Sequence, residues 1–362
     1  MARAEDYAKA IAVINAARRV LLTSHVRPDG DAAGCMAAMW ELLKGLGKEV
    51  HPLFLSPLPA WYSFLFDANI PVLGRDIGEN ALNAEPYAAC DLAIILDTNS
   101  YVQLPVVGKW LKTSGMRVLV IDHHITSDHI GDTEVVDAAA SATGIVCSHL
   151  IKRGGWKLTP RLATALFTAV GTDTGWFRFA SVDSQTFSVA KVLAEAGAKP
   201  AELYRRLYQN YSAARMRLLA RLMLNMKLEM ENRLAIVLVT SRDFAETGAE
   251  KNDTDNLIDE FQRIESVEAV LMAAEQDDGG WRCSLRSRGL VDVQKIAAMY
   301  GGGGHKAASG VTMNAPLEEV LGTLQKEVAA QLAQPAQPSD MNRRPILAGD
   351  ATGGNGPTRI RT

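Results

Sequence analysis

The sequence contains few cysteines, and none of them forms a metal-binding pair. The four are widely separated, at Cys35, Cys90, Cys147 and Cys283. Zinc ribbons need closely spaced cysteine pairs and small disulfide scaffolds need many cysteines, so the sequence excludes both classes. We expect these thiols to be reduced and mostly packed in the interior.

Long hydrophobic runs are also missing. No stretch approaches the roughly 18 uninterrupted apolar residues that a membrane-spanning helix needs. The first six residues include acidic side chains and start no apolar run of signal-peptide length. The sequence therefore predicts a cytoplasmic protein with no membrane partner.

An excess of basic residues is absent as well. The chain has 38 basic and 41 acidic residues, and its formal net charge is −3. Proteins that coat long nucleic acids need many lysines and arginines facing phosphates, so this class is disfavoured. A small anionic substrate in a local basic pocket remains compatible with the charge.

The composition is that of a globular protein. The 362 residues are 48% hydrophobic and 22% charged, and this length favours two domains over one. In the first half, short apolar runs alternate with helical stretches, which predicts a doubly wound α/β domain with a mainly parallel sheet. The expected strands are 19–26, 50–55, 92–96 and 117–121, with a helix at 31–46.

The second half predicts a change of organisation. Helical patterns at 160–170 and 183–196 are followed by a long helical stretch, 200–231, which we interpret as a bridging helix. Beyond it, strands at 234–240, 267–274 and 281–286 and helices at 254–264 and 291–299 predict a smaller α/β domain. The expected domains are 1–195, a helical linker 196–232, a second domain 233–333 and a disordered tail 334–362.

The residues with the clearest chemistry follow the first strand, in the segment SHVRPDGD. His25, Asp29 and Asp31 lie between a predicted strand and a predicted helix, where ligands bind in open α/β sheets. Taken alone, this pattern also fits a polar turn with a helix cap at Asp31.

Two further strand ends favour a ligand site. Asp97 follows the strand LAIIL, and Asp122, His123 and His124 follow RVLVI. Asp173, in GTDTG, follows the helix 160–170. Neighbouring desolvated carboxylates repel one another unless a cation neutralises them, so the clustering implies bound metal.

The ligand types predict two divalent cations. Four carboxylates carry a formal charge of −4 that two such ions would balance. Carboxylates combined with imidazoles favour Mn²⁺, with Mg²⁺ as the alternative. The candidate ligands are His25, Asp29, Asp31, Asp97, His123 and Asp173.

The ordered set HVRPDGDA, LDTNS, DHH and GTDTG resembles the four motifs of the DHH phosphoesterases, over roughly residues 20 to 180. The resemblance implies a two-metal phosphohydrolase in which His124 contacts the scissile phosphate and Asp122 orients the histidines. It assigns one ion to His25, Asp29 and Asp97, and the other to Asp31, Asp97, His123 and Asp173.

A glycine-rich segment, GGGGHKAASG at 301–310, follows a predicted helix in the second domain. Consecutive glycines allow backbone N–H groups to approach a phosphate, but glycines alone also fit a surface loop. Together with SLRS at 284–287, the segment resembles the DHH-associated substrate-binding domain over about 234–330. The implied substrate contacts are Arg286, Ser287, Gly302, Gly303, Gly304 and His305.

The pair of domains resembles bacterial nucleases that degrade very short RNAs and also dephosphorylate 3′-phosphoadenosine 5′-phosphate to AMP. The implied partners are oligoribonucleotides of a few residues, this bisphosphate, linear or cyclic dinucleotides, and a second copy of the chain in a homodimer. A manganese inorganic pyrophosphatase and a long-strand exonuclease are rivals within the superfamily. A nucleotide sensor without turnover is the alternative from another class.

Overall fold

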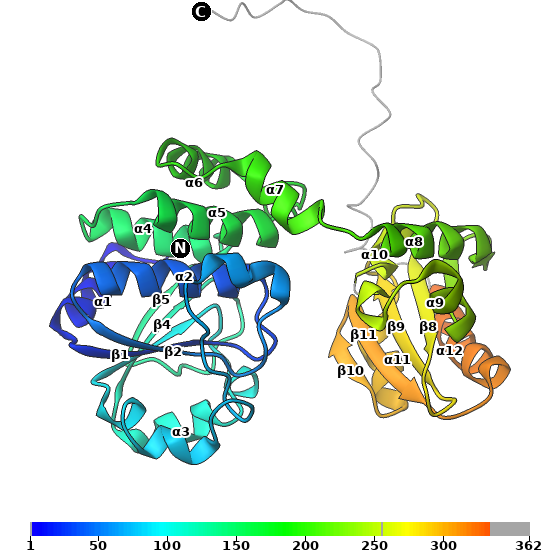
Figure 1. The fold of residues 1–362 in the computed structure, drawn as a ribbon, viewed down its shortest axis with the longest axis horizontal. Helices are drawn as coiled ribbons and strands as arrows, with labels where there is room; N and C mark the ends of the chain where they lie inside the picture. Colours follow the sequence, from blue (N-terminus) through cyan, green and yellow to red (C-terminus); the bar gives the residue numbers. More distant parts are fainter. Residues whose placement is uncertain (1, 255, 334–362) are drawn as a thin grey trace, which may run out of the picture. The chain divides into compact units, whose positions relative to one another are not determined.

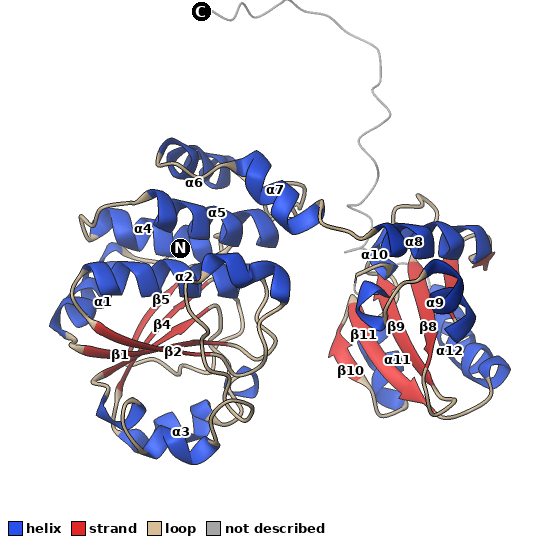
Figure 2. Cartoon of the chain, viewed as in Figure 1, coloured by secondary structure: helices blue, strands red, loops and turns tan. Residues whose placement is uncertain are grey.

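The computed structural model describes residues 2–254 and 256–333, with only the backbone of His305. The predicted tail, 334–362, lies outside the described residues. The chain divides into two compact units, Met1–Asn210 and a second one that starts at Tyr211. Figures 1 and 2 show that each unit has its own sheet with its own covering helices.

The first unit is built on a parallel five-stranded sheet of order β2-β1-β3-β4-β5. All four of its neighbouring strand pairs are parallel, as the continuous apolar runs predict. Every expected strand of this unit is present, so the predicted fold class is confirmed. The strands are β1 (Arg19–Ser24), β2 (Glu49–Leu53), β3 (Leu92–Leu96), β4 (Arg117–Asp122) and β5 (Thr133–Val136).

Helices cover both faces of this sheet, and alternate strand residues face opposite cores. Leu22, Ile94 and Ile121 pack against α1, α2, α4 and α5. Leu21 and Ile95 pack on the other face, with α3. The helices are α1 (Ala4–Ala16), α2 (Gly30–Gly45), α3 (Val107–Ser114), α4 (Thr143–Arg153), α5 (Pro160–Asp173), α6 (Ser184–Glu195) and α7 (Pro200–Tyr208).

The sequence prediction missed α1, α3, α4 and β5. α4 starts with small residues rather than an amphipathic turn, and β5 has only four residues. A strand as short as β5 carries too few repeats for hydrophobic periodicity to be recognised. α4 is important for the site, because its first turn contacts two aspartates there.

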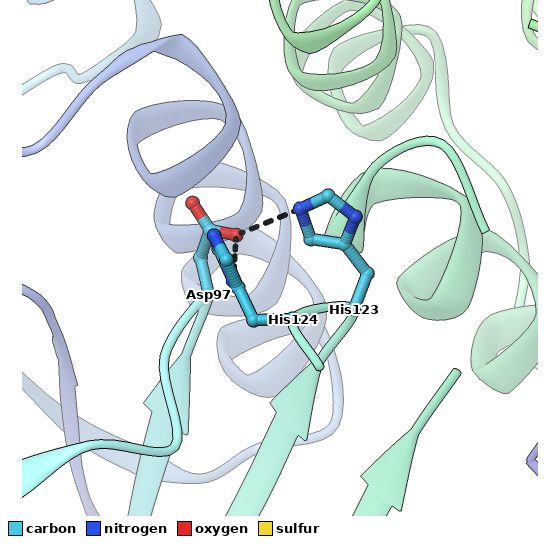
Figure 3. A group of neighbouring side chains, drawn as sticks. All are labelled: Asp97, His123 and His124. Carbon is cyan, nitrogen blue, oxygen red and sulfur yellow. Dashed lines mark ion pairs between the residues drawn. The ribbon is translucent and has the colours of Figure 1, made fainter. Parts of the chain in front are cut away.

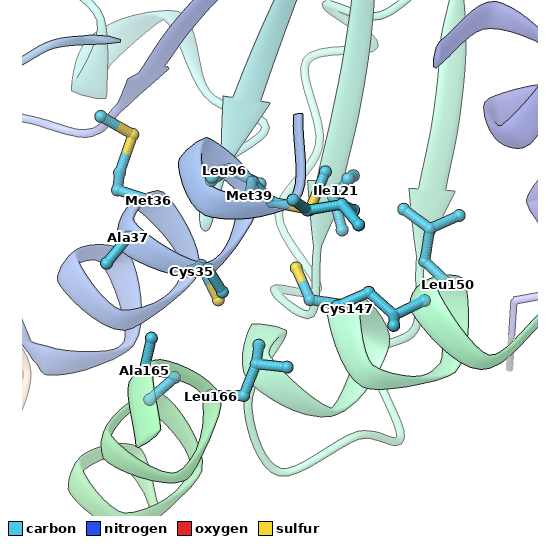
Figure 4. Packing of buried hydrophobic residues seen from close by; sticks show 14 of the residues in the cluster. Cys35, Met36, Ala37, Met39, Leu96, Ile121, Cys147, Leu150, Ala165 and Leu166 are labelled. Atoms are coloured by element: carbon cyan, nitrogen blue, oxygen red, sulfur yellow. The ribbon is translucent and has the colours of Figure 1, made fainter. Parts of the chain in front are cut away.

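The contact between α2 and α5 fixes the start of α2, which carries candidate ligands. Figure 4 shows Cys35 and Met39 of α2 in one buried cluster with Ile121 of β4, Cys147 of α4 and Leu166 of α5. All four cysteines are free thiols and buried, which confirms that expectation.

Gly34→Ala is expected to destabilise the first unit. An added Cβ would lie 2.5 Å from the carbonyl oxygen of Ala165 and 2.8 Å from the amide nitrogen of Ala169, and both are backbone atoms. Overpacking of this kind costs about 1–3 kcal/mol. Urea unfolding followed by tryptophan fluorescence measures this loss of stability as a lower midpoint. The signal reports mainly on the first unit, because Trp281 is the one tryptophan of the sequence outside that unit.

Gly45→Ala is the matched control in the same helix. Nothing lies within 4 Å of the Cβ that it would add, and its φ is not positive. Glycine costs about 1 kcal/mol relative to alanine in a helix, so this change should be neutral or stabilising. Equal midpoints for the two variants would contradict the close α2–α5 contact.

The second unit has a mixed six-stranded sheet of order β10-β11-β9-β8-β7-β6. β7 and β8 are parallel, and the other neighbouring pairs are antiparallel. The strands are β6 (Lys227–Glu229), β7 (Leu234–Val239), β8 (Ala269–Glu275), β9 (Trp281–Ser287), β10 (Gly303–His305) and β11 (Ala308–Met313).

Both faces of this second sheet are covered by helices. One core contains residues of α11 and α12, and the other contains residues of α8 and α10. The helices are α8 (Ala213–Asn225), α9 (Ser241–Thr247), α10 (Ile258–Phe261), α11 (Val293–Met299) and α12 (Leu317–Leu332). The helix expected at 254–264 is reduced to α10 and the short 3₁₀ turn η5 (Lys251–Thr254).

The prediction of one long bridging helix over 200–231 is wrong. α7 ends at Tyr208 and packs on the first unit, where the rings of Trp176 and Tyr204 are 5.4 Å apart. α8 begins after Ser212, whose hydroxyl accepts a hydrogen bond from the amide of Arg215 at 2.9 Å. This serine cap interrupts the helical pattern and starts a second helix.

Candidate metal centre and substrate contacts

The candidate metal ligands gather at the carboxyl edge of the first sheet. Ser24 pairs with Leu96, and Leu96 pairs with Ile121, so β1, β3 and β4 end level with one another. The residues that follow these strands are therefore neighbours: His25 after β1, Asp97 after β3, and the Asp-His-His motif at the end of β4. Asp97 takes a left-handed backbone conformation, with φ of 63°.

Two helices add the remaining carboxylates. Asp29 is the N-cap of α2 and accepts hydrogen bonds from the amides of Asp31 and Ala32. Asp31 lies in the first turn of this helix, while Asp173 is the last residue of α5. The close packing of α2 on α5 brings the two helix ends to the same edge.

All six predicted ligands come together. Three groups have their potential ligand atoms within 4.8 Å of one another. The groups are His25, Asp29 and Asp97; Asp31, His123 and Asp173; and Asp97, His123 and His124. Figure 3 shows the third group, with both imidazoles close to the carboxylate of Asp97. Asp97 thus links the two ends of the cluster.

The histidine rings are oriented as metal ligands usually are. Nδ1 of His25 lies 2.9 Å from the carbonyl oxygen of Val26, and Nδ1 of His123 lies 3.1 Å from that of Ala140. A carbonyl only accepts, so Nδ1 carries the proton and Nε2 keeps a lone pair. The Nε2 of His25 is 3.4 Å from Asp97 Oδ2, and that of His123 is 3.3 Å from Asp173 Oδ2.

Electrostatics show that the cluster is short of positive charge. Asp31 and Asp97 are 1% and 2% exposed. Burial, together with the neighbouring carboxylates, raises the pKa of both well above the usual range. Burial also raises the pKa of Asp173. Cations between these imidazole lone pairs and buried carboxylates would stabilise the charged carboxylates, so the residues fit hard divalent metal ions.

The DHH motif itself holds a histidine in a fixed orientation. Oδ1 of buried Asp122 accepts hydrogen bonds from the backbone amides of His123 and His124, at 2.8 and 3.2 Å, and lies 2.8 Å from Nδ1 of His124. The hydrogen bond to Asp122 raises the pKa of His124 to about 9. The His124 side chain is 53% exposed, so its other ring nitrogen can reach a ligand.

The sequence prediction missed the supporting contacts from the start of α4. The amide of Thr143 donates to Asp31 Oδ2 at 2.6 Å, and the amide of Gly144 donates to Asp31 Oδ1 at 2.9 Å. The Thr143 hydroxyl donates to Asp97 Oδ1 at 2.8 Å. The small-residue run SATG at 141–144 marks the segment that makes these contacts. It does not reveal their partners, because the contacts join residues more than 40 positions apart.

The predicted substrate contacts of the second unit have structural partners of their own. The Nε of Arg286 donates to Asp259 Oδ1 at 3.0 Å. The Ser287 hydroxyl oxygen accepts from the amides of Gly289 and Val291. Arg288 donates to two backbone carbonyls near the end of α10, those of Gln262 and Glu265.

The glycine-rich segment, for which the sequence left a surface loop open, forms the β10–β11 hairpin. An added Cβ at Gly302 would lie 2.3 Å from the carbonyl oxygen of Gly310, and one at Gly304 would lie 2.5 Å from that of Ala308. Close backbone approach therefore requires these two glycines. At Gly303 nothing lies within 4 Å of an added Cβ, so no neighbouring atom requires glycine there.

A parallel sheet with His and Asp ligands at its carboxyl edge, followed by a smaller mixed-sheet unit, defines the class of two-unit DHH proteins. Residues 19–170 match the DHH family, N-terminal domain, and residues 231–334 match the DHHA1 domain. The chain belongs to the DHH family, so the resemblance stated from its motifs is confirmed.

Named relatives cover most of the chain. It is 33% identical over 300 residues to the bifunctional oligoribonuclease and PAP phosphatase NrnA of Thermus thermophilus, covering 81% of this chain and 84% of the relative. The NrnA of Bacillus subtilis is 27% identical over 297 residues, covering 81% and 89%.

Solved structures share the fold. An exopolyphosphatase-related protein from Bacteroides fragilis superposes with a TM-score of 0.80 at 23% identity, covering 91% of this chain and 97% of the other. The exonuclease RecJ bound to manganese gives a TM-score of 0.53 at 16% identity, covering 92% and 96%. In the described part of the chain, no helix combines the length and apolar character needed to cross a membrane.

Proposed function

We propose that this protein is a metal-dependent phosphohydrolase that degrades short oligoribonucleotides to mononucleotides and converts 3′-phosphoadenosine 5′-phosphate to AMP. The observation that carries the proposal is the cluster of six His and Asp side chains, in which Asp97 belongs to more than one group of potential ligands. The chain that holds this cluster is related to NrnA over more than four fifths of its length. Linear and cyclic dinucleotides, a homodimer and a cytoplasmic location belong to the same proposal.

The ligand set supports two cations, with Mn²⁺ preferred over Mg²⁺. His25, Asp29 and Asp97 would hold one, and Asp97 would be shared with the other. The second set would be the group Asp31, His123 and Asp173 together with Asp97, whose Oδ1 lies 3.8 Å from His123 Nε2. When bound, such ions lower the pKa of water and neutralise charge on a phosphate.

The residues of the chain have separate tasks around that chemistry. The amides of Thr143 and Gly144 hold the carboxylate of Asp31, while the Thr143 hydroxyl holds that of Asp97. Asp122 fixes the ring of His124, whose protonated form donates a hydrogen bond to a phosphoryl oxygen. Such a preorganised donor stabilises the charge that develops as the bond breaks.

The proposal is tested by release of mononucleotide from a 5′-labelled RNA dinucleotide, with and without Mn²⁺. Inorganic pyrophosphate and 3′-phosphoadenosine 5′-phosphate are assayed in parallel. Manganese-dependent release of mononucleotide is the expected result. Activity on pyrophosphate alone would indicate a pyrophosphatase instead, and tight nucleotide binding without hydrolysis of any substrate would indicate a sensor.

Arg286→Ala is expected to raise KM for the dinucleotide about tenfold or more while kcat changes little, because a hydrogen bond to a charged group contributes roughly 1.5–3 kcal/mol. The change should affect the fold little, since its partner Asp259 is 51% exposed and stays hydrated. Steady-state kinetics measure it, and Arg282→Ala, an exposed arginine of the same strand, is the control. An unchanged KM would remove Arg286 from the substrate contacts.

A further inference from the structure

The turn that follows the candidate ligand Asp173 has a strained backbone. Three consecutive residues, Gly175, Trp176 and Phe177, have left-handed φ values of 55°, 60° and 65°. Glycine adopts this conformation freely, but bulky aromatic residues do so at a cost in free energy. Strain of this kind persists only where the surrounding structure enforces it, and it is frequent at ligand sites.

The surroundings hold this turn firmly. The Thr174 carbonyl oxygen accepts from the amides of Arg178 and Phe179, at 2.9 and 3.1 Å, and its hydroxyl oxygen accepts from the amide of Phe177 at 3.1 Å. The ring of Trp176 is anchored in an aromatic cluster. Its centroid lies 5.8 Å from that of Phe167, 5.4 Å from Tyr204 and 5.6 Å from Tyr208.

The turn presents a cation and a ring to solvent. The Nε of Arg178 donates to the carbonyl oxygen of Gly175 at 2.6 Å, which fixes the guanidinium and leaves its terminal nitrogens available. Within residues 2–254 and 256–333, Arg178 forms no ion pair. The ring of Phe179 covers Gly175, because a Cβ added at Gly175 would lie 2.4 Å from that ring. Phe179 nevertheless remains 54% exposed.

We propose that residues 174–179 form a nucleotide-binding element of the first unit, in which Arg178 binds a phosphate and Phe179 stacks on a base. The inference rests on the proposed function. An aromatic face accepts any base, and a guanidinium matches phosphate oxygens bidentately. One rigid turn directly after a candidate metal ligand carries both groups, and a nucleotide is the ligand class that offers both counterparts.

This element would give the first unit its own contact with the substrate, separate from the residues predicted in the second unit. The two side chains should also respond differently to changes in the substrate. The contribution of Phe179 depends on the presence of a base, whereas that of Arg178 depends on a phosphate. A purely structural role for either residue would make no such distinction.

The test compares wild type with Phe179→Leu and Arg178→Gln on the RNA dinucleotide pApA and on two analogues, each lacking one of its adenines. Phe179→Leu keeps apolar bulk over Gly175 but removes the ring. We expect both variants to lower kcat/KM for pApA at least about fivefold, mainly through KM, since stacking on an aromatic ring contributes about 1–3 kcal/mol per base. For one of the two analogues, the difference between wild type and Phe179→Leu should disappear.

Two controls accompany these variants. Phe179→Tyr keeps an aromatic face and should restore the wild-type kinetics. Arg117→Gln removes an exposed arginine at the first residue of β4, the amino end of that strand, and should change nothing. Thermal unfolding of all variants, followed by circular dichroism, should show similar midpoints because both tested side chains are exposed.

The outcomes separate this inference from the proposed function. If wild type cleaves pApA but Phe179→Leu and Arg178→Gln match it, the inference is overturned while the proposed function stands. The same holds if the loss in Phe179→Leu is equal on both analogues. If wild type cleaves no nucleotide, the proposed function fails, and calorimetric titration with AMP then tests the inference. Weaker AMP binding in both variants supports the inference, and unchanged AMP binding overturns it.

Discussion

Asp97→Asn is expected to lower kcat for the RNA dinucleotide by more than about 1,000-fold, because it weakens both ends of the proposed metal pair and metal ions supply several kcal/mol of transition-state stabilisation. One oxygen of Asp97 lies 3.4 Å from His25 Nε2, and the other lies 3.8 Å from His123 Nε2. Replacing one oxygen by an amide removes charge and a ligand atom at the shared position. Calorimetric titration with Mn²⁺ should show weaker binding or a lower number of sites.

Asp91→Asn is the matched control for this prediction. Asp91 lies immediately before β3, so it stands at the opposite end of the same strand, and its carboxylate is exposed and accepts from the amides of Arg18 and Arg19. We expect nearly normal turnover and metal binding. A wild-type kcat in Asp97→Asn would refute the shared role of Asp97.

The stability of the metal-free protein distinguishes a metal ligand from a structural carboxylate. Burial and neighbouring carboxylates raise the folded-state pKa of Asp97 above its unfolded value. Its ionisation therefore opposes folding, and the stability of wild type in EDTA should fall as the pH rises from about 4, the unfolded pKa, towards the raised folded pKa. In Asp97→Asn, stability should decrease less with rising pH than in wild type, and the variant should unfold at a higher temperature at neutral pH. A lower melting temperature would assign Asp97 a structural role.

His124→Ala is expected to lower kcat about 100- to 1,000-fold while Mn²⁺ binding is retained, which is the usual loss on removal of a preorganised donor to a developing oxyanion. The ring is held by Asp122, and its free nitrogen is not needed by any neighbour in the described structure. Steady-state kinetics and calorimetric titration with Mn²⁺ measure the two effects separately.

His129→Ala is the control for this histidine. Its side chain is 85% exposed and lies in the loop after β4, five residues beyond His124. It should leave turnover and Mn²⁺ affinity unchanged. Because His124 Nδ1 also lies 3.8 Å from Asp97 Oδ1, loss of metal binding in His124→Ala would show instead that this residue is a ligand.

The two predictions together form a diagnostic pair. Asp97→Asn should reduce both metal affinity and turnover, whereas His124→Ala should reduce turnover alone. The pattern follows from geometry, because Asp97 is buried at the centre of the ligand groups and His124 is at their solvent side. If both variants lose metal binding equally, the division between ligands and substrate donor is wrong.

Several features of the fold could not be predicted from local sequence patterns. Ser212 interrupts the amphipathic pattern of 200–231 with a helix cap, so two helices form in two units instead of one bridge. The hairpin of β10 and β11 depends on Gly302 and Gly304 meeting the backbone of another strand, which spacing alone does not reveal. Both contacts are short in sequence, three residues for the cap and four to eight for the hairpin, but the spacing of apolar residues records neither of them.

The sequence by itself determined the candidate ligands and the sheet that carries them. Apolar runs end in His and Asp, and parallel strands place such ends at one edge, so His25, Asp97 and His123 were expected close together. The pairing of β3 with both β1 and β4 makes them neighbours. Only the tertiary structure decided how they are held. Thr143 reaches Asp31 across 112 positions of sequence, and Trp176 is anchored by α7, because long-range packing selects partners that no local pattern encodes.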